Sequence, residues 1–529
     1  MTAIEIRNAR VYDPETKVDG DVSDVLIEDG RIVSKIKAKK KTVIDAKGKV
    51  VMAGGVDVHT HVAGSAINSA RLLRPEDKTV IWAKTKYTHS GTGFSCPSTY
   101  LTGYQYALLG YSHVTEPAVS PLKAKHTHEE LADIPLMDKA ALLLLGNNYL
   151  VAKYIKEKDQ EGLTDYCAWM LDRTKTYGIK LVAPGAYLSW IWGEKKTLPD
   201  SKIPKLDVTP SDIITHLEEA AEKLKLPHPI HVHLNGMGYY GNVKSSLAEM
   251  KLAKKRMHIA HLQFSSYGGN SWREFESKAA ETIKEVNRNK KLTFDIGQVT
   301  HDKTTTLTAD APFEQYLSFL LREKWNDGDV ELEHGAGVVP IHYHKDHPVN
   351  AVQWATGLEL ALLAEDLERV VLSTDHPNAA PFMRYPRIIS WLMDKKARDT
   401  YADGTHNAVA DKTSLYSIDR EYSLYDVAMI TRLAPAKILG LKDKGLSKGS
   451  AANVAVYDLS DGIEEGFSRA CHTILDGEFA VKDGEVVSTA PGQTIHYEKT
   501  KDMPKLEGEM TDFFKHYYSV CLSNYRVVT

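Results

Sequence analysis

Apolar and polar residues alternate in two different ways along this chain, and each way predicts a different set of elements. Near both ends, short alternating runs are interrupted by Asp-Gly turns, which is typical of antiparallel hairpins. At one end, Ala3–Val11 is followed by the hairpin Val25–Val33. At the other, Val454–Asp458 precedes the hairpin Glu478–Val487, whose turn nearly repeats the first. The hairpins therefore predict one small β domain built from both chain ends, residues 1–52 and 441–490.

Between residues 53 and 440, apolar runs of strand length alternate with amphipathic stretches of helix length. This alternation favours a parallel α/β sheet or a (β/α)8 barrel. The clearest predicted strands are Ile179–Val182, Ile230–Leu234, Met257–Leu262, Leu292–Ile296 and Val370–Thr374, and the predicted helices are Ile213–Leu224, Trp272–Asn287 and Ala351–Ala364. Residues 491–529 end in the aromatic segment Phe513–Tyr518, which we expect to pack as a C-terminal arm on the protein's own core; docking of a partner is the alternative.

Composition and charge narrow the class of protein. With 529 residues, of which 43% are hydrophobic and 26% charged, the chain is typical of a globular protein. A net charge of −4 gives no electrostatic basis for binding nucleic acid. No apolar stretch reaches the roughly 20 residues of a membrane span, and Met1–Ile6 lacks signal-peptide features, so we expect a cytoplasmic protein without a membrane partner. Its four cysteines form no C-x-x-C pair, so no iron–sulfur cluster or disulfide framework is predicted.

The first candidate for chemistry is the pair His59 and His61, which follows the apolar run Val50–Ala53 and Gly54-Gly55. Residues two apart in a strand point to the same face, so both imidazoles can reach one divalent metal ion such as zinc. The alternative is a strand that merely carries two exposed histidines.

Lys180 is the only charged residue in the apolar run Ile179–Val182. A buried ammonium is unfavourable unless its charge is removed or paired. Carbamylation by carbon dioxide would convert it into an anionic group with two oxygens that can bridge two metal ions. The alternative is an amine that reaches the strand end and pairs with a carboxylate.

Two further histidine pairs lie at predicted strand ends. Of His231 and His233, the second is nearer the strand end, so we favour it as a ligand, with His231 as a supporting histidine behind the site. His258 and His261 are three residues apart and cannot share a strand face, so His261 is the predicted ligand and His258 a bystander.

Asp375 ends the apolar run Val370–Thr374. An aspartate there can bind a metal ion with one oxygen and exchange protons with the other. The alternative is a surface aspartate that caps a turn, where Asp and Pro are common.

Taken in chain order, these strand-end residues match the pattern of the amidohydrolase superfamily. The resemblance implies a distorted TIM-like (β/α)8 barrel with a composite β-sandwich from both chain ends. It also implies two zinc ions, bridged by a carboxylated lysine (N6-carboxylysine) at Lys180, with Asp375 as general base and then general acid. The implied metal ligands are His59, His61, Lys180, His233, His261 and Asp375.

Longer motifs resemble the amidohydrolase-type component of formylmethanofuran dehydrogenase and its counterpart in the formyltransferase/hydrolase complex. They are Met52–Asp57, Arg71–Asp77, Pro97–Tyr104, His126–Glu130, Gly146–Asn148, Gln263–Gly269, Thr304–Asp310, Gly337–Pro340 and Arg384–Arg387. The resemblance implies a binuclear zinc subunit of a multisubunit one-carbon complex, which hydrolyses N-formylmethanofuran to formate and methanofuran or catalyses the reverse condensation. It leaves the direction open.

Two features lean toward the bacterial formyltransferase/hydrolase branch over the archaeal branch, which condenses formate with methanofuran during carbon dioxide reduction. Ser90–Gly93 resembles the bacterial sequence, and Asp375-His376-Pro377 departs from the Asp-Ser-Pro usual in archaea. Asn235 and His376 are candidates for contact with the formyl group.

Two departures from the family pattern limit what can be carried over. Ala183-Pro184 replaces the usual Asn-Pro after Lys180. The extra histidines His334, His342, His344 and His347 could form another metal site, or be surface and hydrogen-bonding residues. Two other function classes remain open: a stand-alone cyclic-amide hydrolase resembling dihydropyrimidinase, and a non-catalytic scaffold.

Overall fold

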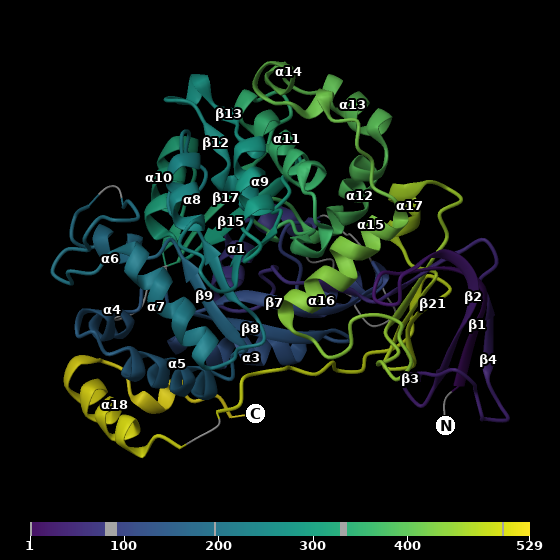
Figure 1. Ribbon diagram of the computed structural model, residues 1–529, viewed down its shortest axis with the longest axis horizontal. Helices are drawn as coiled ribbons and strands as arrows, with labels where there is room; N and C mark the ends of the chain where they lie inside the picture. Colours follow the sequence, from purple (N-terminus) through teal and green to yellow (C-terminus); the bar gives the residue numbers. More distant parts are fainter. Residues whose placement is uncertain (1–2, 80–92, 195–196, 328–335, 500–501, 529) are drawn as a thin grey trace.

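A computed structural model describes residues 3–79, 93–194, 197–327, 336–499 and 502–528, and it places a parallel barrel between a mixed β-sheet and a C-terminal helix (Figure 1). Among these residues, no helix has both the length and the apolar character needed to cross a membrane.

The barrel consists of eight parallel strands that are almost entirely buried. The chain of neighbours is closed where Thr60 forms a parallel bridge with His376 and the His61 amide donates to the His376 carbonyl at 2.7 Å. In sheet order, the strands are β6 (Gly55–Asp57), β7 (Tyr111–Val119), β8 (Asp138–Leu144), β9 (Gly178–Val182), β10 (Ile230–His233), β11 (Met257–Ile259), β14 (Leu292–Asp295) and β18 (Val370–Val371). The expected TIM-like barrel is confirmed.

Helices surround this sheet, and the start of one of them has a clear local cause. The helix predicted at Ile213–Leu224 begins at Pro210, because Thr209 and Asp212 form a reciprocal capping box. The helices are α1 (Ser65–Leu73), α2 (Thr99–Leu108), α3 (Ala124–Asp133), α4 (Tyr149–Lys156), α5 (Gln160–Thr174), α6 (Ala186–Trp190), α7 (Pro210–Lys223), α8 (Val243–Met250), α9 (Ala279–Arg288), α10 (Ala311–Leu321), α11 (Pro348–Leu363), α12 (Tyr385–Met393), α13 (Lys395–Asp403), α14 (Ala408–Lys412), α15 (Leu424–Ala428) and α16 (Ala434–Leu439).

The helix predicted over Trp272–Asn287 is wrong in its first part. Trp272–Glu274 forms a 3-10 turn, and β13 (Glu276–Ser277) pairs with β12 (Tyr267–Gly268). Phe275 is buried against the Tyr267 ring, with ring centroids 4.4 Å apart. This tertiary contact overrides the helical periodicity until α9 begins at Ala279.

A three-stranded antiparallel sheet belongs to the excursion between β14 and β18. It comprises β15 (Lys303–Thr308), β17 (Gly337–His342) and β16 (Asn326–Asp327), and α10 and α1 pack against it. Its threonine-rich first strand is buried from Thr304 to Thr308. Both this strand and α10 contribute residues to the cavity described below.

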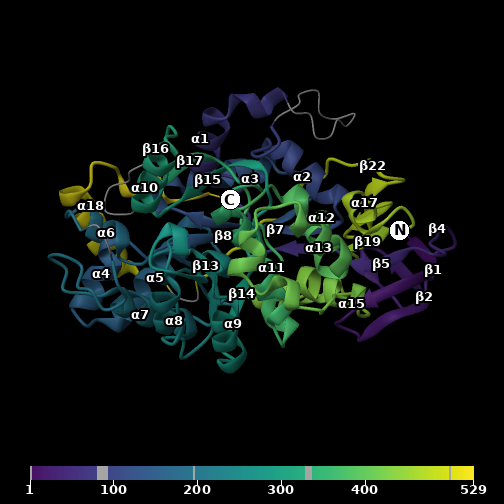
Figure 2. The ribbon, with the colours of Figure 1, turned by 90° about the horizontal axis from the view of Figure 1, so that it is seen from above.

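Nine strands from both chain ends form a single mixed sheet, shown at one end of the molecule in Figure 2. The sheet forks at β1, which pairs with β2 along one edge and with β4 and then β5 along the other, around a separate apolar core. Both predicted hairpins are present, and their Asp-Gly turns have positive φ at each residue. The strands are β1 (Ala3–Asp13), β2 (Val18–Glu28), β3 (Arg31–Ile32), β4 (Thr42–Asp45), β5 (Val50–Ala53), β19 (Val454–Tyr457), β20 (His472–Leu475), β21 (Glu478–Lys482) and β22 (Glu485–Val486), and α17 (Ile463–Ser468) follows β19.

The described part of the C-terminal segment runs along the barrel and contacts β8 and α5. In Figure 1 it runs from the composite sheet beneath the barrel to α18 (Pro504–Tyr517) on the far side. The Lys139 amide donates to the Gln493 carbonyl, and the Ile495 amide donates to the Lys139 carbonyl, so the chain pairs with the start of β8. Glu507 of α18 accepts a hydrogen bond from the Trp169 indole at 2.6 Å, which fixes the helix against α5.

Candidate active site

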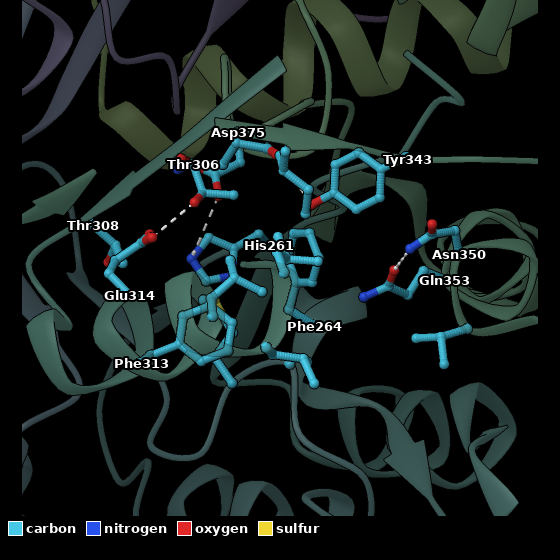
Figure 3. A pocket seen from close by; sticks show the side chains of 18 of the residues that line it. His261, Phe264, Thr306, Thr308, Phe313, Glu314, Tyr343, Asn350, Gln353 and Asp375 are labelled. Atoms are coloured by element: carbon cyan, nitrogen blue, oxygen red, sulfur yellow. Dashed lines mark hydrogen bonds and ion pairs between the residues drawn. The ribbon is translucent and has the colours of Figure 1, made fainter. Parts of the chain in front are cut away.

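A cavity of about 580 Å³ lies over the carboxyl ends of the barrel strands (Figure 3). Barrel enzymes place their active sites at this end. The cavity is lined by all six residues predicted as metal ligands, namely His59, His61, Lys180, His233, His261 and Asp375. Each of the six is at most 6% exposed, so their ionisable groups are buried around the cavity.

Asp375 brings the first two histidines together, although it lies more than 300 positions away in the chain. Its Oδ1 is 3.0 Å from His59 Nε2 and 3.4 Å from His61 Nε2. The ligand atoms of these three residues all lie within 4.8 Å of one another, close enough to hold one metal ion.

His61 is fixed from behind by Glu116 on β7. Glu116 Oε1 lies 3.0 Å from His61 Nδ1, while its Oε2 accepts hydrogen bonds from the amides of Val62 and Ala63. Burial alone would lower the pKa of His61, but Glu116 and Asp375 outweigh it and raise that pKa to about 9. The two carboxylates therefore stabilise positive charge at this position, and a bound metal ion, which needs the neutral ring, would replace the proton on His61.

His59 is held by Asp295, at the end of β14. Asp295 Oδ2 lies 3.0 Å from His59 Nδ1, which assigns the proton to that nitrogen and leaves Nε2 to face Asp375. Carboxylates behind ligating histidines commonly fix the ring and its tautomer in this way. His59, His231 and Asp295 also form a second group whose ligand atoms lie close enough to hold a metal ion.

The six predicted ligands form the polar floor of the cavity. His233 and His261 lie next to each other in this floor. His233 Nδ1 lies 3.2 Å from His261 Nε2. Two ligands about 2.0–2.1 Å from one tetrahedral zinc ion would be roughly 3.3 Å apart. Burial, and then the charge of His261, hold the pKa of His233 well below its usual value, so its ring is neutral, as metal binding requires.

The backbone at His261 is unusual and has a local cause. Strand β11 ends at Ile259, earlier than predicted, and His261 follows in the left-handed region with φ 32°. A Cβ atom on Gly297 would lie only 2.3 Å from the His261 Cβ atom. A glycine at 297 is therefore what allows His261 to take this position.

Lys180 lies in β9 and is 1% exposed. Its Nζ has no hydrogen-bond partner among the described residues, and no described carboxylate lies within ion-pair distance of it. Burial lowers its pKa to about 8, despite the opposing influence of Asp295, Asp375 and Glu116. The alternative of a lysine paired with a carboxylate at the strand end therefore finds no support in the geometry.

His231 lies behind the cavity and does not line it. Its Nε2 is 3.1 Å from His59 Nδ1, and its Nδ1 is 3.1 Å from His228 Nε2. His258 contacts Asp295 through Nε2 at 3.3 Å. Both histidines thus surround the Asp295–His59 pair, while His233 and His261 reach the cavity.

The structure does not bring Asn235 or His376 to this cavity. The Asn235 amide nitrogen donates to Glu249 Oε1 at 2.8 Å and to the Pro184 carbonyl. His376 Nδ1 accepts from the Phe382 amide, and its ring packs edge-on against the Phe382 ring. Both side chains serve neighbouring loops, so contact of either with a formyl group remains a prediction without geometric support.

Two acidic residues that matter here were missed in the sequence. Asp295 is the only charged residue in Leu292–Ile296, the same signal that singled out Lys180. Glu116 had no comparable signal, because β7 carries several polar residues and was not predicted.

The extra histidines do not form a metal group among the described residues. The His342 and His344 rings lie 3.5 Å apart between centroids, and His347 lines the mouth of the cavity. His334 lies outside the described residues, as do residues 90–92 of the stretch that leans toward the bacterial branch.

Comparison with known proteins places the chain in a family. An amidohydrolase family model matches residues 42–487. Protein FwdA of Methanocaldococcus jannaschii is 46% identical over 99% of this chain and 96% of its own. The FhcA component of the formyltransferase/hydrolase complex Fhc of Methylorubrum extorquens is 37% identical over 94% and 91%. Overall identity therefore does not support the lean toward the bacterial branch.

Solved structures agree. The crystal structure of the complex FhcABCD from Methylorubrum extorquens, determined with methylofuran, superposes with a TM-score of 0.93 at 35% identity, covering 99% of this chain and 97% of the matched chain. Dihydropyrimidinase from Brevibacillus agri reaches a TM-score of 0.51 at 13% identity, which shows the common fold alone. The chain belongs to the amidohydrolase family and is a homologue of FwdA and FhcA.

Proposed function

We propose that this chain is a binuclear zinc amidohydrolase subunit that cleaves the formyl amide of an N-formylmethanofuran-type substrate, or forms it in reverse. The observation that carries the proposal is the convergence of six predicted ligands on one buried cavity, with the Lys180 amine unpartnered among them. The fold match to the FhcABCD structure with methylofuran supports the choice of substrate.

The donor set suits two zinc ions. Neutral imidazoles and carboxylates are ligands that zinc prefers. His59, His61 and Asp375 would hold one ion, and His233 and His261 the other. The neutral Lys180 amine would add to carbon dioxide, forming an N–C bond and releasing one proton, and the resulting carbamate would serve both ions. When bound, zinc polarises a carbonyl oxygen and lowers the pKa of water.

Asp375 would carry out the proton transfer in this reaction. Burial would raise the pKa of Asp375, but the neighbouring His59 and His261 hold it well below its usual value in the metal-free chain, and a bound zinc ion would likewise favour the ionised carboxylate. Asp375 would take a proton from the attacking water and give it to the amine nitrogen as the amide bond breaks. Condensation would use the same steps in reverse, so the geometry serves either direction.

Formate release from N-formylmethanofuran by the zinc-loaded chain tests the proposal, and Lys180→Met is the key variant. Lys139 on the neighbouring strand is the matched control, since it is equally buried but donates to the Ile134 carbonyl, away from the cavity. We expect Lys139→Met to keep formate release and Lys180→Met to lose it. No release by the wild type would overturn the proposal, and turnover of dihydrouracil or hydantoin instead would favour a cyclic-amide hydrolase.

The physiological direction depends on partner subunits, which mass spectrometry of co-purifying proteins from the native host would identify. A formyltransferase partner without a molybdopterin or tungstopterin subunit would favour formate release. A metal–pterin formate dehydrogenase subunit would instead favour condensation in carbon dioxide reduction. Absence of both would favour a stand-alone enzyme.

A further inference from the structure

Glu314 is a buried carboxylic acid that reaches the same cavity from outside the barrel strands. It lies in the first turn of α10, is 0% exposed, and lines the cavity together with the six predicted ligands. Figure 3 shows its carboxyl group directed toward Thr306 on β15. None of the steps described so far uses this side chain.

The hydrogen bonds around Glu314 can be counted atom by atom. Thr306 Oγ1 lies 2.8 Å from Glu314 Oε2 and 3.2 Å from the Val339 carbonyl oxygen. A threonine hydroxyl has one hydrogen, and a carbonyl oxygen only accepts. Both contacts are satisfied when Thr306 donates to Val339 and a protonated Glu314 donates from Oε2 to Thr306. Oε1 is then a carbonyl-type acceptor, and it has no partner among the described residues.

The surroundings favour this neutral form and hold it in place. Burial, together with the charges of Asp310 and Asp375, holds the pKa of Glu314 well above its usual value. A Cβ atom on Gly337 would lie 2.2 Å from the Glu314 Cβ atom, so the stem of the side chain packs directly against the β17 backbone.

Two other buried glutamates show what is particular to Glu314. Both oxygens of Glu249 accept hydrogen bonds from Asn235. Both oxygens of Glu359 accept hydrogen bonds from Ser277 and Ser414. Neither residue lines the cavity, whereas Glu314 lines it and keeps one buried oxygen, Oε1, without a partner among the described residues.

We propose that Glu314 Oε1 accepts the N–H of the substrate's amide and so makes the site selective for amides of primary amines. The inference rests on the proposed function, because such an amide presents one acceptor, its carbonyl oxygen, and one donor, its N–H. The polar floor takes the carbonyl, while Phe264 and Phe313 nearby offer only apolar surface. An amide without an N–H would leave the buried Glu314 Oε1 unpaired in the complex. The cost of this unpaired acceptor lowers the affinity for such an amide and so makes the site selective.

A pair of probes that differ in one N–H tests this selectivity. N-formylfurfurylamine and N-formyl-N-methylfurfurylamine are titrated calorimetrically into the zinc-loaded full chain. We expect the wild type to bind the first at least about tenfold more tightly, the value of one good hydrogen bond. Glu314→Gln keeps an acceptor oxygen and a group that can donate to Thr306, so it should keep the preference. Glu314→Met should abolish it.

Glu359→Met is the matched control, since it removes a buried glutamate that does not face the cavity. It should lower the melting temperature and leave the preference for the N–H probe unchanged. A wild type that binds both probes equally, or neither, would overturn the proposal. So would a preference that survives Glu314→Met, or one that Glu314→Gln loses completely.

Formate release from N-formylmethanofuran is measured separately on the same wild-type preparation. A Glu314-dependent preference without formate release would support the acceptor role and contradict the proposed function. Formate release without a preference for the N–H probe would support the proposed function and contradict the acceptor role of Glu314.

Discussion

The polar floor of the cavity and the core of the composite sheet are both buried, but the first consists of polar and charged side chains and the second of apolar ones. The floor collects histidines, carboxylates and a lysine whose desolvation is unfavourable in the folded chain. The composite sheet encloses a core of side chains such as Ile6, Ile27, Val454 and Ile474. Stability and chemistry are thus separated, and burial by itself says nothing about which role a residue has.

The two regions are nonetheless joined by a short stretch of chain. β5 belongs to the composite sheet, Gly54 follows it, and β6 enters the barrel at Gly55. A Cβ atom on Gly54 would lie 2.6 Å from the Ser112 hydroxyl, so the crossing requires glycine. The apolar sheet thereby anchors the strand that presents His59 and His61.

The largest effect is expected at the floor. Asp375→Asn keeps the size of the side chain but removes its ability to take a proton, so turnover should fall about 10²–10⁴-fold, the usual contribution of general acid–base catalysis. Formate release and thermal melting are measured together, and we expect the melting temperature to stay within a few degrees of the wild type. Activity near the wild-type level would contradict the role of Asp375.

Asp295→Asn tests whether the carboxylate behind His59 orients this predicted metal ligand. The variant would hold the His59 ring less well, and such changes typically weaken metal binding about 10–100-fold. Competition with a zinc-chelating dye measures the affinity. Asp302→Asn removes a partly buried carboxylate paired with Arg384 instead, and should leave zinc affinity unchanged. Equal affinities for all three proteins would show that Asp295 does not orient the site.

The composite sheet should respond in the opposite way. Ile474 is fully buried opposite Val454, so Ile474→Ala should lower the free energy of unfolding by about 2–5 kcal/mol. Turnover per zinc-loaded molecule should be unchanged at a temperature where the variant is folded. Val22→Ala in the same sheet is the control, because Val22 is 67% exposed and should barely affect melting. If Ile474→Ala lost turnover without losing stability, the separation between a stabilising sheet and a chemically active floor would be contradicted.

The smallest effect concerns Glu249, a buried acid beside Asn235. Burial raises its pKa from 4.5 to about 7. Because the folded form binds the proton more tightly, its contribution to stability is complete below pH 4.5 and is lost as pH rises to 7. Glu249→Gln lacks this loss, so its melting temperature relative to the wild type should rise by a few degrees between pH 5 and pH 8. A constant difference would mean that Glu249 is ionised throughout.

Local sequence determined the hairpins and most of the barrel strands, and it singled out the six cavity residues as candidates, which the resemblance to the amidohydrolase pattern joined into one predicted site. Asp-Gly turns act over four residues, and strand alternation acts over two, so neighbours in the chain are enough to define them. The strand containing Lys180 and the paired histidines His59 and His61 could therefore be located from the sequence before any contact was known.

Only the tertiary structure decided which groups support them. Asp295 is 236 residues from His59, and Glu116 is 55 residues from His61, so no local pattern could pair them. The same holds for Phe275, whose packing on Tyr267 delays α9, and for Asn235, which turns toward Glu249 and away from the cavity. In the sequence, Glu314 is an ordinary acidic residue in the first turn of a helix. Only the fold shows that it is buried and lines the cavity. A side chain's type and position follow from the sequence, whereas its partners and its proton depend on which distant segments the fold brings within hydrogen-bond distance.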